Sequence, residues 1–154
     1  MRSSVVGISL LLAGCYTIHT PTEQQYNRGG VQIAFISKAG VSGGARAGYN
    51  REGIPVVEYD PSFVGKFPEE MQSFIFHHEI GHIILGHNAT ENSLLSEKEV
   101  NSIEQQADCY SIRVLEEGLK YNFAQIEKVY HYVSIYFDQK RADNLLRCIS
   151  PNNH

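Results

Sequence analysis

The stretch 74–87, FIFHHEIGHIILGH, limits most strongly what this chain can fold into. It contains the pattern H-E-x-x-H as His78, Glu79 and His82, among apolar residues that favour a helix. Residues four apart lie on one face of a helix, so His78 and His82 can bind the same metal ion. Glu79 can reach the open side of that ion and take a proton from a water molecule there. The stretch therefore predicts a helix with two metal ligands and a general base.

A second pattern can supply the third ligand that a zinc protease site needs beside its open coordination position. The sequence EQQAD at 104–108 sets Glu104 and Asp108 four residues apart, on one face of a second helix. We predict that Glu104 completes the ligand set and that Asp108 accepts a hydrogen bond from a ligating imidazole. The alternatives are a solvated Glu104 and a pair of ordinary core or surface histidines at 78 and 82. Glu79 and the matched E-x-x-x-D argue against ordinary histidines. The apolar stripe around Glu104 argues against a solvated side chain, because a carboxylate there needs a partner.

H-E-x-x-H followed by E-x-x-A-D resembles the gluzincin zinc metallopeptidases, most of all the CAAX-prenyl-protease and HtpX-like families and the compact minigluzincins. The resemblance covers residues 54–108. It implies a zincin-like fold and an endopeptidase that cleaves peptides or unfolded proteins, with one Zn²⁺ ion held by His78, His82 and Glu104. It also implies that an edge strand of the sheet pairs with the extended substrate. The sequence leaves open which strand that is.

Peptide hydrolysis also needs a group that stabilises the developing oxyanion. The candidates near the C-terminus are His131, Tyr136 and Arg141. In HtpX-like families an arginine often follows a His-Pro dipeptide, but Arg141 follows Asp-Gln-Lys. A surface cation is the alternative interpretation of Arg141. His77 and His87 are predicted to be surface residues.

Composition limits the broader class. The chain has 154 residues, 42% hydrophobic and 19% charged, as expected for one soluble globular domain. Its net charge is −4 and it has no basic block, which argues against a nucleic-acid partner. Strands are predicted at 31–36, 45–49 and 54–59, the last two as a hairpin. Helices are predicted to start near residues 68, 96 and 122, with a last helix over 139–149. The expected fold is α+β, a small and mostly antiparallel sheet with helices on one face.

The N-terminus is predicted to lie outside this domain. Residues 1–14 combine Arg2 with a short apolar run, and Leu-Ala-Gly-Cys at 12–15 resembles the lipobox of a bacterial lipoprotein signal. This predicts a lipid on Cys15, a tether over 15–30 and a single domain over 31–154 in the bacterial envelope, facing the periplasm or the exterior. An ordinary signal peptide with an incidental cysteine is the alternative.

Export would place the two other cysteines, Cys109 and Cys148, in an oxidising compartment. We predict a disulfide between them that joins the last helix to the helix of Glu104. The alternative is that the two residues are too far apart to be bridged.

Three other functional classes can be compared with this prediction. A metzincin would need glycine and histidine where this chain has Leu85 and Asn88. A non-catalytic envelope assembly or adaptor protein would hold a structural zinc with four ligands, the fourth being His87. An enzyme that cleaves another amide, such as a peptidoglycan bond, receives no support, because the chain has no tryptophan for stacking on carbohydrate.

Overall fold

The computed structural model describes residue 18 and residues 31–87 and 95–149. They form an α+β fold, as predicted, in which helix predominates over a three-stranded sheet. The predicted signal peptide, lipidated Cys15 and tether lie outside the described residues, apart from Ile18. No helix in the described part of the chain has the length and apolar character that crossing a membrane requires.

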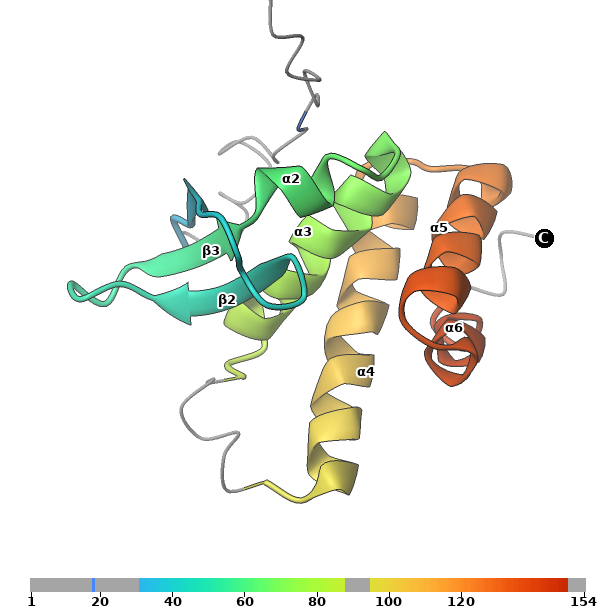
Figure 1. Ribbon diagram of the computed structural model, residues 1–154. Helices are drawn as coiled ribbons and strands as arrows, with labels where there is room; N and C mark the ends of the chain where they lie inside the picture. The colour runs from blue at the N-terminus through green and yellow to red at the C-terminus, as the bar shows by residue number, and fades with distance from the viewer. Residues whose placement is uncertain (1–17, 19–30, 88–94, 150–154) are drawn as a thin grey trace, which may run out of the picture.

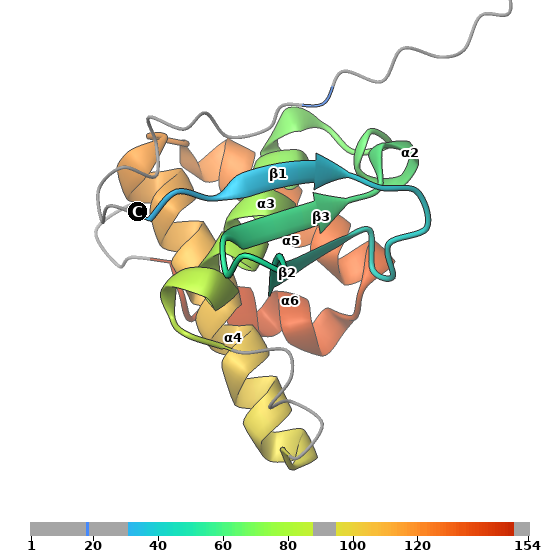
Figure 2. The same ribbon diagram turned by 90° about the vertical axis from the view of Figure 1, so that its left-hand side faces the viewer.

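The sheet is mixed, with strand order β1-β3-β2. The β2–β3 pair is the predicted antiparallel hairpin, whereas β1 pairs in parallel with β3. A mostly antiparallel sheet was expected, but of the two strand pairs in the described residues one is antiparallel and the other is parallel. The connection after β1 passes beyond β3 to place β2 on the far side, which leaves β3 in the centre (Figure 2). The strands are β1 Ala34–Ser37, β2 Ala45–Tyr49 and β3 Pro55–Tyr59.

Local capping explains where the main helices start. The helix that carries H-E-x-x-H begins after Pro68, and the next two begin with capping boxes in which Ser96 pairs with Glu99 and Asn122 with Gln125. The last helix ends at Leu145, four residues earlier than the predicted 149. A one-turn helix after β3 and a π-helical turn were not predicted. The helices are α2 Pro61–Val64, α3 Glu69–Ile84, α4 Glu97–Arg113, the π-helix η3 Val114–Gly118, α5 Phe123–Tyr136 and α6 Gln139–Leu145.

Helix α3 lies at the centre of the fold (Figure 1). It contacts β2 and β3 on one side and α4 and α5 on the other. It is consequently buried on nearly all sides, and even His77 is only 1% exposed. The prediction that His77 is a surface residue was therefore wrong: its ring packs in the core and its Nδ1 lies 2.6 Å from the Ser73 carbonyl oxygen.

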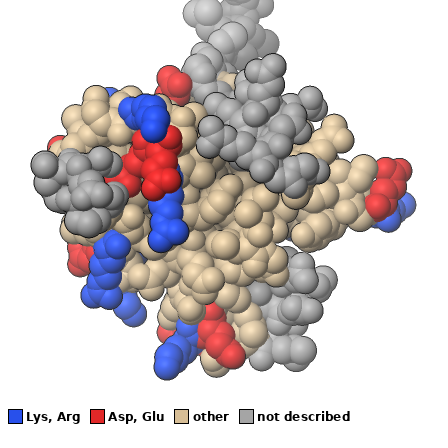
Figure 3. All heavy atoms as spheres, turned by 180° about the vertical axis from the view of Figure 1, so that it is seen from behind, with Lys and Arg blue, Asp and Glu red and all other residues tan. Residues whose placement is uncertain are grey.

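Charged side chains of opposite sign lie side by side on the surface. On the face shown in Figure 3, Lys and Arg side chains neighbour Asp and Glu side chains, separated by wide uncharged areas. Two of the exposed pairs join Lys38 and Arg46 to Glu58. Such pairs contribute little to stability, so the core is the main source of it.

Gly81 allows α3 and α4 to approach each other closely. A Cβ atom at this position would lie 3.2 Å from both Cα and the carbonyl oxygen of Ala107, and 3.1 Å from the Tyr110 ring. Backbone atoms cannot move aside as a flexible side chain can. The close approach brings α4 to the face of α3 that carries His78 and His82.

We expect Gly81→Val to reduce the free energy of unfolding by roughly 1–3 kcal/mol, because the larger side chain must push α4 away from α3. Gly48→Ala is the matched control, since nothing lies within 4 Å of a Cβ atom there. Urea unfolding of both variants measures the difference. Equal stabilities would show that the α3–α4 contact does not depend on glycine.

Candidate metal centre

Three side chains from two helices converge as a possible metal-binding group. His78 and His82 come from α3, and Glu104 comes from α4. The two Nε2 atoms lie 3.1 Å apart, and the Glu104 oxygens lie 3.3 Å from Nε2 of His78 and 3.5 Å from Nε2 of His82. Ligands bound tetrahedrally to zinc at its usual bond lengths would be about 3.3 Å apart. The donor types and their spacing therefore fit one zinc-sized cation.

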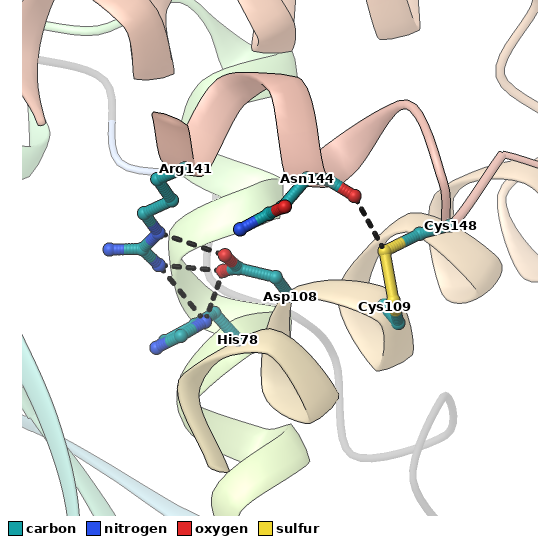
Figure 4. The surroundings of a disulfide bond; sticks show 6 residues. All are labelled: His78, Asp108, Cys109, Arg141, Asn144 and Cys148. Carbon is teal, nitrogen blue, oxygen red and sulfur yellow. Dashed lines mark hydrogen bonds and ion pairs between the residues drawn. A yellow bond between two sulfur atoms is a disulfide. The ribbon is translucent and has the colours of Figure 1, made fainter. Parts of the chain in front are cut away.

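Asp108 and Arg141 lie on the Nδ1 side of the His78 ring (Figure 4). The Asp108 Oδ1 atom lies 2.7 Å from Nδ1 of His78 and accepts a hydrogen bond from its N–H, which leaves Nε2 as the nitrogen available to a metal ion. Arg141 donates to both oxygens of the same carboxylate, from Nε at 2.8 Å and from Nη2 at 2.6 Å. The Nη2 atom also lies 3.2 Å from Nδ1 of His78, but arginine has no acceptor, so both nitrogens donate to Oδ1.

The Arg141 side chain is only 21% exposed and its guanidinium lies 4.8 Å over the Phe137 ring. The alternative of an ordinary surface cation was therefore wrong. Its two hydrogen bonds to Asp108 place it on the Nδ1 side of His78, which favours orientation of a ligand over direct contact with an oxyanion. Its proposed role at the transition state stays a prediction.

The other two oxyanion candidates lie on α5. His131 is exposed and packs near the Tyr132 ring at 5.9 Å. Tyr136 packs edge-on against Phe67, with ring centroids 5.0 Å apart. Neither belongs to the metal-binding group found among the described residues.

His87 contacts His82, one of the possible metal ligands, at Nδ1 and not at Nε2, the nitrogen that faces Glu104. Gly86 adopts a positive φ of 73° after α3, and the chain turns back so that the His87 N–H donates to the His82 carbonyl oxygen. The two Nδ1 atoms then lie 3.2 Å apart, on the side of His82 that faces away from Glu104. His87 was predicted to be a surface residue, but it is half-buried. Within the described residues the possible metal-binding group contains three side chains and not His87.

Glu79 is positioned by the edge of the sheet. Its Oε2 atom accepts the backbone N–H of Ala47 in β2 at 2.7 Å. In the antiparallel hairpin, Gly44 and Asn50 make their backbone bonds toward β3, so the residues at 45, 47 and 49 direct theirs to the open edge. Among the described strands β2 lies at an open edge of the sheet, and the fold brings this edge next to Glu79.

The pKa values of His78, His82 and Glu79 reflect both burial and the charges of their neighbours. Burial opposes a charge on His78, yet its hydrogen bonds with Asp108 and Glu104 raise its pKa from 6.5 to about 9. Burial and the neighbouring charge of His78 lower the pKa of His82 to about 4. Burial raises the pKa of the Glu79 carboxyl. A field that stabilises positive charge on an imidazole also favours a divalent cation at the same place.

The cysteines predicted to pair are joined in the structure. A disulfide links Cys109 of α4 to Cys148, which follows α6, with Cα atoms 4.9 Å apart. The distance alternative is thus excluded for this pair. Cys109 directly follows Asp108, so the disulfide lies beside the metal centre (Figure 4).

We expect the domain to bind one Zn²⁺ ion, and Glu104→Ala to weaken that binding strongly because a ligand is lost. Asp108→Ala should weaken it by a smaller factor of about 10–100, because only the orientation of His78 is lost. Glu127→Ala is the control for loss of a carboxylate, since Glu127 is exposed on α5. Competition with a chromophoric chelator measures all three. If Glu104→Ala binds zinc as tightly as the control, the ligand assignment is wrong.

Comparison with known proteins adds independent support for the chemistry. Residues 70–145 match the family model of Peptidase U49, a range that begins in α3 and ends with α6. The matched range contains the three possible metal ligands and the side chains of Glu79, Asp108 and Arg141. No curated protein and no solved structure matches the chain. The family match supports a peptidase, which acts on a peptide or protein substrate.

Proposed function

We propose that this chain is a zinc-dependent endopeptidase of the gluzincin type, anchored in the bacterial cell envelope by a lipid on Cys15. The observation that carries the proposal is the convergence of His78, His82 and Glu104 within 4.8 Å of one another, with Glu79 on the same helix as the two histidines. The match to a peptidase family supports the same reaction class.

Each residue of the centre has a separate chemical task. Zinc bound by the three ligands would polarise the scissile carbonyl group and lower the pKa of water. Glu79 accepts the proton of the attacking water and later delivers it to the leaving amine. The Ala47 N–H holds Oε2 of Glu79, so Oε1 is the oxygen available for that proton. Asp108 keeps the proton of His78 on Nδ1, which holds the ring in the orientation that metal binding needs.

The open edge of β2 provides a place for an extended substrate. The backbone groups of residues 45 and 49 and the carbonyl group of Ala47 face outward beside Glu79, whereas the Ala47 N–H is already bound to Glu79. Pairing through main-chain hydrogen bonds gives affinity with little dependence on sequence. We therefore propose that the substrate is an unfolded protein or an extended peptide, which can supply a free strand.

The rival function is a non-catalytic adaptor that keeps a structural zinc. Such sites are closed by four protein ligands, whereas catalytic sites have three and an open position. His87 was the expected fourth ligand, and it contacts Nδ1 of His82 instead of the metal-facing side. The geometry of the described residues thus favours the enzyme.

We expect Glu79→Gln to retain zinc, because the three ligands are unchanged, and to lose peptide cleavage by at least the 10²–10⁴-fold typical of a missing general base. Glu127→Gln is the control, since Glu127 is exposed on α5. Metal content and cleavage of unfolded casein are measured on the same samples. Full activity of Glu79→Gln would contradict the proposal that this centre hydrolyses peptides.

We expect Cys15→Ser to release the protein from the membrane fraction of cells, because an acyl chain on Cys15 is the proposed anchor. The comparison is between wild type and variant after separation of membranes by centrifugation. Equal membrane association of both would contradict the lipid anchor and leave the peptidase proposal standing.

A further inference from the structure

Helix α6 is joined to α4 by two consecutive residues of α4. Asp108 binds Arg141 in the first turn of α6, and Cys109 binds Cys148 just beyond its last turn. Figure 4 shows both links side by side, with His78 on the other side of Asp108. The disulfide and the hydrogen bond to a metal ligand are therefore connected through one short stretch of α4.

The position of α6 depends on such links. The helix has seven residues, too few for stability on its own in water. It buries two side chains in the core, Ala142 and Leu145. Its side-chain hydrogen bonds to α5 run from Gln139 Nε2 to the Tyr130 hydroxyl and from that hydroxyl to Asp143, and both are exposed. Without the disulfide, α6 would be attached covalently at its α5 end only within the described chain.

Arg141 can bind Asp108 only while α6 is in place. Asp138 caps α6 by accepting the backbone N–H of Arg141 at 2.7 Å, which ties the guanidinium to the orientation of the helix. A bidentate arginine–carboxylate pair is sensitive to small displacements, because two N–H groups must align with two oxygens. A shift of α6 would therefore break the two hydrogen bonds from Arg141 to Asp108 and leave the hydrogen bond between Asp108 and His78 in place.

We propose that the Cys109–Cys148 disulfide is a redox-sensitive link that keeps Arg141 on Asp108, so that its reduction weakens metal binding at His78 without unfolding the domain. Arg141 is in this view a positioning residue, which acts on the ligand through Asp108. The inference rests on the proposed zinc site, although it does not require that the site cleaves peptides.

Cys109 is the less buried of the two cysteines and gives the side from which a reductant would approach. Cys109 is half-buried and lines a surface pocket of about 420 Å³, whereas Cys148 is buried. Arg113, one turn further along α4, lines the same pocket and would attract an incoming thiolate. The other lining residues are Leu85, Ser102, Gln105, Gln106 and Tyr110.

Reduction by a dithiol balances as an ordinary exchange. One thiolate of the dithiol attacks Cys109 Sγ, the S–S bond breaks, and Cys148 leaves as a thiolate that takes up a proton. The second thiolate closes the dithiol into a cyclic disulfide and releases Cys109, so the protein gains two electrons and two protons. The Cys148 sulfur lies 3.6 Å from the Asn144 carbonyl oxygen, which can accept the new S–H. The buried thiol of the reduced form thus has a partner ready.

The first experiment compares the zinc dissociation constants of the oxidised and the dithiothreitol-reduced protein, with the reductant removed before titration against a chelator. Thiol titration under denaturing conditions should find no thiol of Cys109 or Cys148 before reduction and both after it. Zinc binding should weaken by about 10–100-fold on reduction, as for loss of a partner that orients a ligand. Circular dichroism checks that the helices persist.

Variants test whether the effect passes through Arg141. Arg141→Gln should weaken zinc binding in the oxidised protein, and reduction should then add little, because the two changes remove the same contact. Arg141→Lys should restore only part of the affinity, since lysine cannot bind both oxygens. Lys140→Gln, an exposed cation on the same helix, is the matched control and should respond to reduction like wild type. The double variant Cys109→Ser, Cys148→Ser should bind zinc like the reduced protein and ignore dithiothreitol.

The outcomes separate this inference from the proposed function. Equal zinc affinities in both redox states, global unfolding on reduction, or an equally large redox effect in Arg141→Gln would each overturn the inference. The Co²⁺-loaded protein gives a second readout, because a shift of its visible bands on reduction reports a changed ligand geometry. If zinc affinity follows the redox state but neither form cleaves casein, the peptidase proposal fails and the redox link stands.

Discussion

The buried carboxylate of Asp108 is the interaction on which the rest of the centre depends. Its side chain is 4% exposed, and a buried charge is unfavourable unless it is fully paired. Its partners come from two other helices: the Nδ1–H of His78 in α3 and the guanidinium of Arg141 in α6. Because one carboxylate satisfies both, the position of His78, a proposed metal ligand, is fixed by the packing of three helices rather than by α3 alone.

The fold places that carboxylate by keeping α3 and α4 close together. Gly81 leaves no side chain between the helices, and the sheet covers the opposite side of α3. The same arrangement brings Ala47 of β2 to Glu79. The side chain of the proposed base is thus held by a backbone N–H at the sheet edge, while the side chains of the proposed ligands are held by contacts between helices.

The sequence predicts what local geometry determines. The four-residue spacing placed His78 beside His82 and Glu104 beside Asp108, because a helix fixes those neighbours whatever packs around it. The contact between Arg141 and Asp108, 33 residues apart, could not be predicted in this way, since it depends on where α6 packs. The burial of His77 and the parallel pairing of β1 were missed for the same reason. Each is decided by contacts between elements, and periodicity within one element carries no information about them.

Charge balance explains why this packing favours a cation. Glu79, Glu104 and Asp108 contribute carboxylates to one partly buried region, and Arg141 is the cation that pairs with one of them. The carboxyl groups of Glu79 and Glu104 then remain beside two imidazoles, and the raised pKa of His78 agrees with surroundings that favour positive charge at that ring. A proton on His78 satisfies that field only in part, and it occupies a nitrogen that a metal ion would use. A divalent cation would be balanced by these carboxylates and held by three ligands at once. Pairing Asp108 with an arginine would then leave the ion to Glu104 and keep Asp108 free to orient the His78 ring.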